Sequence, residues 1–170
     1  GNIEAMPGDV IRYDFEKIGN TSTVPLDNFY WRDTIPTDAV RIEKIYTGTW
    51  SEHLHYEVLY KTNKKGWRTL DKPYSNAADL LDCSREALHL GADEAIAEIK
   101  FEFGTVQAGF RQVEAPYILC QVNGDLPNEY RFTNKTDVGG QRGDEWVIAK
   151  DQWTTIIYAK PRGKLPKTGF

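Results

Sequence analysis

Apolar and polar residues alternate along most of this chain. β-branched and aromatic residues take every second position in several runs, and clusters of Gly, Pro, Asn and Asp separate these runs. Because successive side chains of a strand point to opposite faces of a sheet, the alternation predicts strands with one buried face. The predicted strands are residues 9–18, 28–34, 39–49, 53–61, 67–70, 97–105, 117–122, 129–135, 145–149 and 153–159. About ten strands of this length favour two packed sheets.

One stretch follows a different period. Residues 75–98 are rich in Ala, Leu and Glu, and their apolar positions between Leu80 and Leu90 have helical spacing. We expect one or two short helical turns there, the first ended by Gly91, because glycine accepts the left-handed conformation that closes a helix. The sequence therefore predicts an all-β sandwich with a short helical insertion near residues 75–98 that bridges the two sheets.

The composition is that of one folded domain. A chain of 170 residues, 40% of them hydrophobic and 27% charged, can bury a core without disulfides or metal. The net charge of -4 comes from interspersed acids and bases, which argues against nucleic acid as a partner, because phosphates demand a clustered basic surface. No apolar run approaches the ~20 residues that cross a bilayer. We expect one sandwich domain over residues 1–160.

The two cysteines leave the redox state open. Cys83 and Cys120 form either one disulfide, in an oxidising compartment, or two buried thiols. A single bridge is not a disulfide framework, so the fold prediction does not depend on it.

Residues 161–170 are rich in Pro, Gly and Lys and are predicted to form a flexible tether. The tether contains the sequence Leu165-Pro166-Lys167-Thr168-Gly169. It matches the LPxTG sorting signal of sortase substrates at each of the four positions that this signal fixes. The chain thus resembles the wall-anchored surface proteins of Gram-positive bacteria.

This resemblance implies a role as a substrate. Sortase would cleave between Thr168 and Gly169, and the Thr168 carboxyl would be joined to peptidoglycan or to a lysine of another pilin subunit. The attacking cysteine thiolate belongs to sortase. The implied location is extracellular and cell-wall anchored. The protein would contact the membrane only through an apolar tail absent from this fragment.

Motifs in the body of the chain carry a second resemblance. GDVIRY at residues 8–13, GN at 19–20, WRDTIP at 31–36 and FTNKTDV at 132–138 resemble the Ig-like repeats of Gram-positive adhesins and pilins, of the collagen-adhesin isopeptide type. This resemblance covers both ends of the domain but not its middle. It implies an Ig-like sandwich.

Many such repeats carry an intramolecular Lys–Asn isopeptide bond assisted by an acidic residue. Strand parity places Lys17, Asp33 and Asn134 on otherwise apolar faces. Burial would leave Lys17 neutral and nucleophilic toward the Asn134 carbonyl, with protonated Asp33 polarising that carbonyl. Lys150 is a rival donor. In the alternative interpretation the Lys17 amine lies in water at a sheet edge, while Asp33 and Asn134 serve turns.

Other candidate sites are weaker. His53, His55 and Glu57 share a strand face at zinc-ligand spacing, but no further ligand motif accompanies them, so we assign no metal and no cofactor. Arg142-Gly143-Asp144 spells an integrin-binding tripeptide, which often recurs by chance. Four tryptophans could form a sugar-stacking platform or pack in the core. These are Trp50, Trp67, Trp146 and Trp153.

No catalytic constellation stands out, so we expect no enzymatic activity. The predicted function is that of a cell-wall-anchored stalk, adhesin or pilin-like domain, with sortase and peptidoglycan as partners. The alternative is a module that binds host carbohydrate or matrix protein. An exposed, contiguous aromatic groove would favour binding, and a smooth polar surface with an internal cross-link would favour the stalk.

Overall fold

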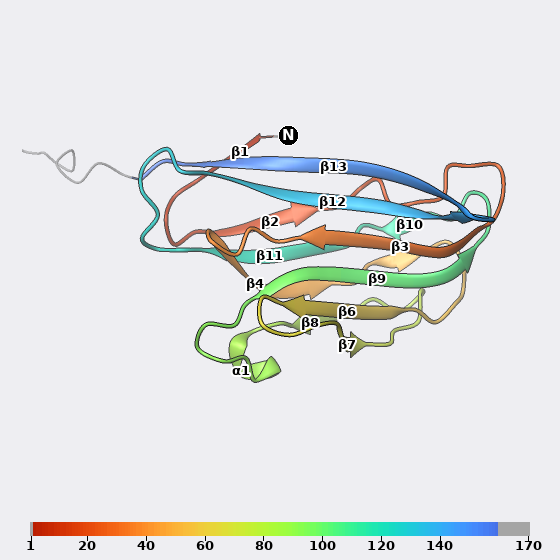
Figure 1. Ribbon diagram of the computed structural model, residues 1–170, viewed down its shortest axis with the longest axis horizontal. Helices are drawn as coiled ribbons and strands as arrows, with labels where there is room; N and C mark the ends of the chain where they lie inside the picture. The colour runs from red at the N-terminus through yellow and green to blue at the C-terminus, as the bar shows by residue number, and fades with distance from the viewer. Residues whose placement is uncertain (1, 160–170) are drawn as a thin grey trace, which may run out of the picture.

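The computed structural model describes residues 2–159, which form two β-sheets packed face to face around one core (Figure 1). A seven-stranded sheet has the order β1-β13-β12-β3-β9-β6-β7, and a four-stranded sheet has the order β2-β11-β4-β8. β10 and β5 pair as a separate ribbon. The predicted all-β sandwich with a short helix is confirmed. Within residues 2–159, no helix is long and apolar enough to span a bilayer.

The strands and the helix have the following bounds: β1 Asn2–Ala5, β2 Val10–Asp14, β3 Leu26–Thr34, β4 Val40–Tyr46, β5 Thr49–Trp50, β6 Glu57–Thr62, β7 Arg68–Asp71, β8 Leu80–Asp82, α1 Arg85–Leu88, β9 Ile96–Val106, β10 Gln112–Glu114, β11 Tyr117–Val122, β12 Arg131–Arg142 and β13 Glu145–Ile157. Every pairing between these strands is antiparallel except that of β1 with β13, which is parallel.

Strand bounds follow the alternation wherever one face of the strand is buried. β11 coincides with the predicted strand 117–122, and Ile118, Cys120 and Val122 are its buried positions. By contrast, the predicted strands 145–149 and 153–159 belong to one continuous strand, β13. The first eight residues of β13 are exposed, so no alternation marks them as strand.

The insertion near residues 75–98 contains one short helix, as predicted, but the rest of the segment is not helical. Its first part is the strand β8, which pairs with β4 of the four-stranded sheet. α1 is one short helix whose N-cap Ser84 accepts a hydrogen bond from the Ala87 backbone N–H. His89, with a φ of 54°, takes the left-handed position that we expected of Gly91. Side chains of the insertion also reach the seven-stranded sheet, so the segment does bridge the sheets.

Candidate functional site

The outer face of the seven-stranded sheet, which points away from the core, carries the most distinctive surface of the molecule. Directly paired residues of antiparallel strands point to the same face, so the register orders the side chains in rows across the strands. One row runs across β13, β12, β3, β9 and β6. It consists of Ile148, Gly139, Tyr30, Glu102 and Glu57.

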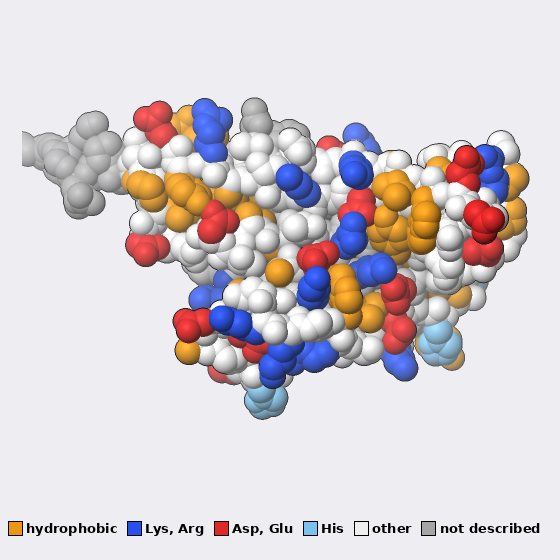
Figure 2. Space-filling view, in the orientation of Figure 1, with side chains coloured by type: hydrophobic (Ala, Val, Ile, Leu, Met, Phe, Trp, Pro, Cys, Tyr) orange, Lys and Arg blue, Asp and Glu red, His pale blue; other side chains and the backbone are white. Residues whose placement is uncertain are grey.

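A parallel row lies beside the first. It consists of Lys150, Asp137, Arg32, Lys100 and Leu59. The two rows together give this face a mixture of aromatic, aliphatic and paired charged side chains. Figure 2 shows the same face, where an apolar patch lies among Lys, Arg, Asp and Glu side chains.

This face is hollowed into an open groove of about 1030 Å³. One end lies at β13, the middle lies over β3 and β9, and the other end lies at β6 and the segments that flank it. The lining residues are Asn28, Phe29, Tyr30, Arg32, His55, Tyr56, Glu57, Lys72, Lys100, Glu102, Phe103, Gly104, Trp146 and Ile148.

Gly139, which pairs with both Tyr30 and Ile148, lets β12 and β13 approach each other closely beside the groove. A Cβ atom at Gly139 would lie 2.5 Å from the backbone oxygen of Val147 and 3.0 Å from Cγ1 of Ile148, so no larger residue fits without a shift of the backbone. The indole of Trp146 stands edge-on to the Tyr30 ring, with the two centroids 6.0 Å apart. Trp146 remains 48% exposed, so its ring is available to a ligand.

Tyr30 is fixed from below by a charged pair. Its hydroxyl donates to Oδ2 of Asp137 at 2.6 Å, and the Arg32 guanidinium donates to both Asp137 oxygens at 3.0 Å. Burial, and then the bond to Asp137, raise the pKa of Tyr30, so the phenol stays protonated and remains a donor. The floor of the groove is therefore rigid and its charge is compensated.

Backbone irregularities cluster at the same place. Asn28 has a φ of 50°, in the left-handed region, and its Nδ2 donates to Oε1 of Gln141 at 2.6 Å. The pairing of β3 with β9 shifts register on both sides of Phe29, and the pairing of β12 with β3 shifts between Gly139 and Gln141. Such bulges re-aim side chains and are common beside functional sites.

The predicted isopeptide residues are only partly brought together. Asn134 Nδ2 donates to Asp33 Oδ1 at 2.6 Å, and both side chains are fully buried between the sheets. Asp33 Oδ2 and Asn134 Oδ1 have no hydrogen-bond partner. Burial raises the pKa of Asp33 well above its ordinary value, and nearby Asp137 raises it further. The direction of this shift favours the protonated acid, and the hydrogen bond from Asn134 opposes it.

Lys17 does not join this pair, and the expectation that its side chain faces the core is wrong. β2 ends at Asp14, so strand parity does not extend to Lys17, which is exposed. The rival donor Lys150 is exposed as well, and no lysine among residues 2–159 is buried. Both lysines line a smaller hollow, of about 490 Å³, together with Trp31 and Thr136.

The two cysteines are free buried thiols. Cys120 on β11 pairs with Ile42 of β4, whereas Cys83 bonds to the backbone of Glu43 from the other side of that strand. Residues two strands apart are separated by roughly 9–10 Å, beyond the reach of a disulfide. Burial raises the pKa of Cys83 to about 12 and that of Cys120 well above its ordinary value.

The remaining candidates are scattered. His53 and His55 precede β6, and His55 packs on Tyr74 with ring centroids 3.6 Å apart. No group of three metal-ligating side chains occurs within residues 2–159. Gly143 occupies the β12–β13 turn, where Arg142 pairs with Glu145 at 2.7 Å.

The four tryptophans do not share a surface. Trp50 is buried in the aromatic core and Trp153 packs on Phe15, whereas Trp67 and Trp146 are exposed. Residues 165–169, the predicted sorting signal, lie outside the described residues.

Sequence reasoning missed the groove, although the alternation carried a signal for it. Tyr30 and Arg32 occupy the outward positions of the predicted strand 28–34, opposite the buried Trp31. That pattern marks them as surface residues. Only the strand order reveals that they lie beside Lys100 and Trp146.

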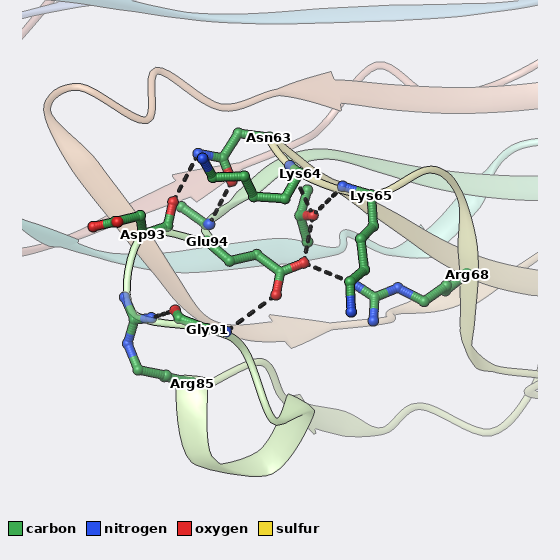
Figure 3. Close-up of polar contacts among 10 residues, drawn as sticks. Asn63, Lys64, Lys65, Arg68, Arg85, Gly91, Asp93 and Glu94 are labelled. Atoms are coloured by element: carbon green, nitrogen blue, oxygen red, sulfur yellow. Dashed lines mark hydrogen bonds and ion pairs between the residues drawn. The ribbon is translucent and has the colours of Figure 1, made fainter.

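A second polar cluster, also missed, surrounds Glu94 (Figure 3). The buried Glu94 carboxylate accepts a hydrogen bond from the Thr62 hydroxyl at 2.6 Å and one from the Gly91 backbone N–H at 3.1 Å. It also forms an ion pair with Arg68 at 3.1 Å. These contacts, that of Thr62 first, hold the pKa of Glu94 below its ordinary value. Because both carboxylate oxygens are engaged, we read this cluster as a structural clamp.

The sequence matches no known protein family model and no curated protein. Among solved structures, a family 123 glycoside hydrolase from Clostridium perfringens, studied for glycolipid glycan hydrolysis, is similar with a TM-score of 0.40 and 8% identity. The match covers 94% of this chain but only 23% of that one. An enzyme that catalyses macrocyclization in alchivemycin A biosynthesis is similar with a TM-score of 0.32 and 10% identity, over 94% of this chain and 85% of the other. At these scores the likeness supports no inference about fold or function.

Proposed function

We propose that this chain is a non-enzymatic domain displayed on the Gram-positive cell wall, as a stalk, adhesin or pilin-like domain, and that it is a substrate of sortase. The observation that carries the proposal is the sequence of residues 165–169, which follows the last strand, β13, after its end at Ile157. Through Thr168 the domain would be joined covalently to peptidoglycan.

The chemistry of this segment suits a transpeptidase. Pro166 has no backbone N–H and a fixed φ, so the residues around it favour an extended conformation. Gly169 leaves the Thr168 carbonyl open to an attacking thiolate.

The strand order supports a load-bearing stalk. β1 and β13 lie side by side and run parallel, in the register Asn2 with Thr154 through Ala5 with Ile157 (Figure 1). Tension between the two ends of the domain would slide these strands along each other and load their hydrogen bonds together. Because Lys17 is exposed whereas Asn134 is buried, the proposal does not include the Lys17–Asn134 cross-link.

Sortase transpeptidation tests the proposal directly. We expect purified sortase to exchange Gly169-Phe170 of this chain for a biotinylated triglycine, with the corresponding mass change in the intact protein. A Thr168→Ala variant should remain unlabelled under the same conditions. An unmodified chain, in a reaction where a reference sortase substrate is converted, would overturn the proposal.

A further inference from the structure

The outer groove exposes a flat ring next to aliphatic surface. Trp146 is 48% exposed and Ile148 is 47% exposed, and both point to the same face of β13. Exposed large apolar side chains that adjoin one another often mark a binding surface. An indole ring suits the apolar face of a sugar ring, which presents C–H groups on a flat surface.

The charges that line the groove cancel in pairs. Arg32 is bonded to Asp137, Lys100 pairs with Glu102 at 3.0 Å, and Lys72 pairs with Glu57 at 3.8 Å. No excess of either sign is left to attract an anionic or a cationic ligand. Paired side chains can still bond to hydroxyl groups, which both donate and accept hydrogen bonds.

The shape favours a chain-like ligand. The groove is open along the sheet, and its volume of about 1030 Å³ lies at the upper end of the range for small-molecule pockets. Trp146 and Ile148 lie at the β13 end, whereas the β6 end combines the rings of His55 and Tyr56 with the charged side chains of Glu57 and Lys72. Several consecutive units of a polymer would therefore contact different chemistry along the groove.

We infer that this groove binds a segment of a neutral polysaccharide. One sugar ring stacks on Trp146, and the following units form hydrogen bonds with Lys100, Glu102 and Glu57. A side chain at Gly139 would clash with the backbone of Val147 and with Ile148, so glycine there keeps the β13 side of the groove in place. This binding activity is independent of anchoring, so an uncut sorting signal would leave it unaffected.

Native affinity gels test the inference with three soluble neutral polysaccharides: hydroxyethylcellulose, galactomannan and mixed-linkage β-glucan. At least one of them should retard the protein. Trp146→Ala should weaken that binding by about tenfold or more, because it removes the stacking ring. Trp146→Tyr should restore part of it. Tyr158→Ala, at an exposed aromatic residue that does not line the groove, is the matched control and should bind like the parent.

Binding to a neutral ligand should also vary little between low and high salt, because no net charge is neutralised. The inference is overturned if none of the three polysaccharides retards the folded protein. It is also overturned if only hyaluronan, polygalacturonate or a matrix protein binds, or if Trp146→Ala binds as tightly as the parent. Thermal melting of each variant confirms that a loss of binding is not a loss of fold.

Discussion

The buried pair of Asp33 and Asn134 places an acidic side chain in an apolar core. The amide of Asn134 already donates to Asp33 Oδ1, which leaves one oxygen of each side chain without a partner. Burial in apolar surroundings penalises the charged form of Asp33, and the oxygen Oδ2 has no donor to compensate a negative charge. Burial is therefore the main cause of the raised pKa of Asp33.

This raised pKa makes the stability of the protein depend on pH. Above pH ~4 the unfolded chain releases the Asp33 proton, whereas the folded chain retains it up to its raised pKa. The free energy of unfolding should therefore fall by about 1.4 kcal/mol per pH unit across that window, counting Asp33 alone. Asp33→Asn removes the titration and keeps two neutral partners. We expect its melting temperature to exceed that of the parent by an amount that grows as the pH rises above ~4 toward the raised pKa of Asp33, by about 2–4 °C for each kcal/mol.

Asp144→Asn, in the exposed β12–β13 turn, is the control for this prediction and should give a nearly constant difference across the same range. If the advantage of Asp33→Asn did not increase with pH, Asp33 would have to be ionised in the folded protein.

At the scale of elements, Glu94 ties the helical insertion to the β6–β7 hairpin. Residues 85–95 comprise α1 and the loop that follows it, and Glu94 connects this segment to Thr62 and Arg68 (Figure 3). Asn63 adds two contacts, because its Nδ2 donates to the Asp93 carbonyl and its Oδ1 accepts from the Ala95 backbone N–H. The insertion is thus held to the seven-stranded sheet by polar contacts as well as by packing.

We expect Glu94→Gln to loosen this loop. The variant loses the ion pair with Arg68 and weakens the bond from Thr62, so amide hydrogens of residues 85–95 should exchange faster at neutral pH, while those of β11 stay protected.

Because the pKa of Glu94 is lowered by folding, the contribution of Glu94 to stability is present above pH ~4.3 and is lost as pH falls through the folded value. The difference in denaturation midpoint between variant and parent should therefore shrink in acid. Glu86→Gln, exposed on α1, should match the parent, and equal exchange in both variants would contradict the clamp.

The strands that could be predicted from sequence are those with one face in the core. β11 alternates clearly, with Ile118, Cys120 and Val122 buried, and in β3 the core-facing positions Phe29, Trp31 and Asp33 keep this period although Tyr30 between them is buried as well. The exposed half of β13 has no such constraint, so its sequence does not distinguish strand from loop. Short edge strands such as β1 exist only because a neighbouring strand offers free hydrogen-bonding groups, which is a tertiary effect.

The candidate sites show the same limit. Parity identified Asp33 and Asn134 as buried polar residues, because both lie within regular strands. It failed for Lys17, which lies three residues beyond the end of β2. The groove depends on which strands are neighbours, and Tyr30, Lys100 and Trp146 come from three strands far apart in sequence. No local pattern contains that information.

For the whole molecule, the parallel pairing of β1 with β13 determines how the domain would respond to force. β13 lies between β1 and β12, and its pairing with β12 extends from Arg131 with Ile156 to Arg142 with Glu145. A pull on the two chain ends acts on β1 toward its N-terminus and on β13 toward its C-terminus. The interstrand hydrogen bonds are then sheared at the same time instead of being broken one after another.

Single-molecule force spectroscopy should show this anisotropy. Pulled through its two ends, the domain should unfold at a higher force than when it is pulled through the C-terminus and a Lys64→Cys handle in the β6–β7 turn. In the second geometry the load acts across the sheet, so the strands separate one after another. Cys83 and Cys120 are buried with raised pKa values, so the handle at residue 64 should react selectively. Removing residues 2–5 should lower the end-to-end unfolding force while leaving the peeling force nearly unchanged. Equal forces in the two geometries would mean that β1 bears no load, and a stalk would then have to derive its strength from elsewhere in the fold.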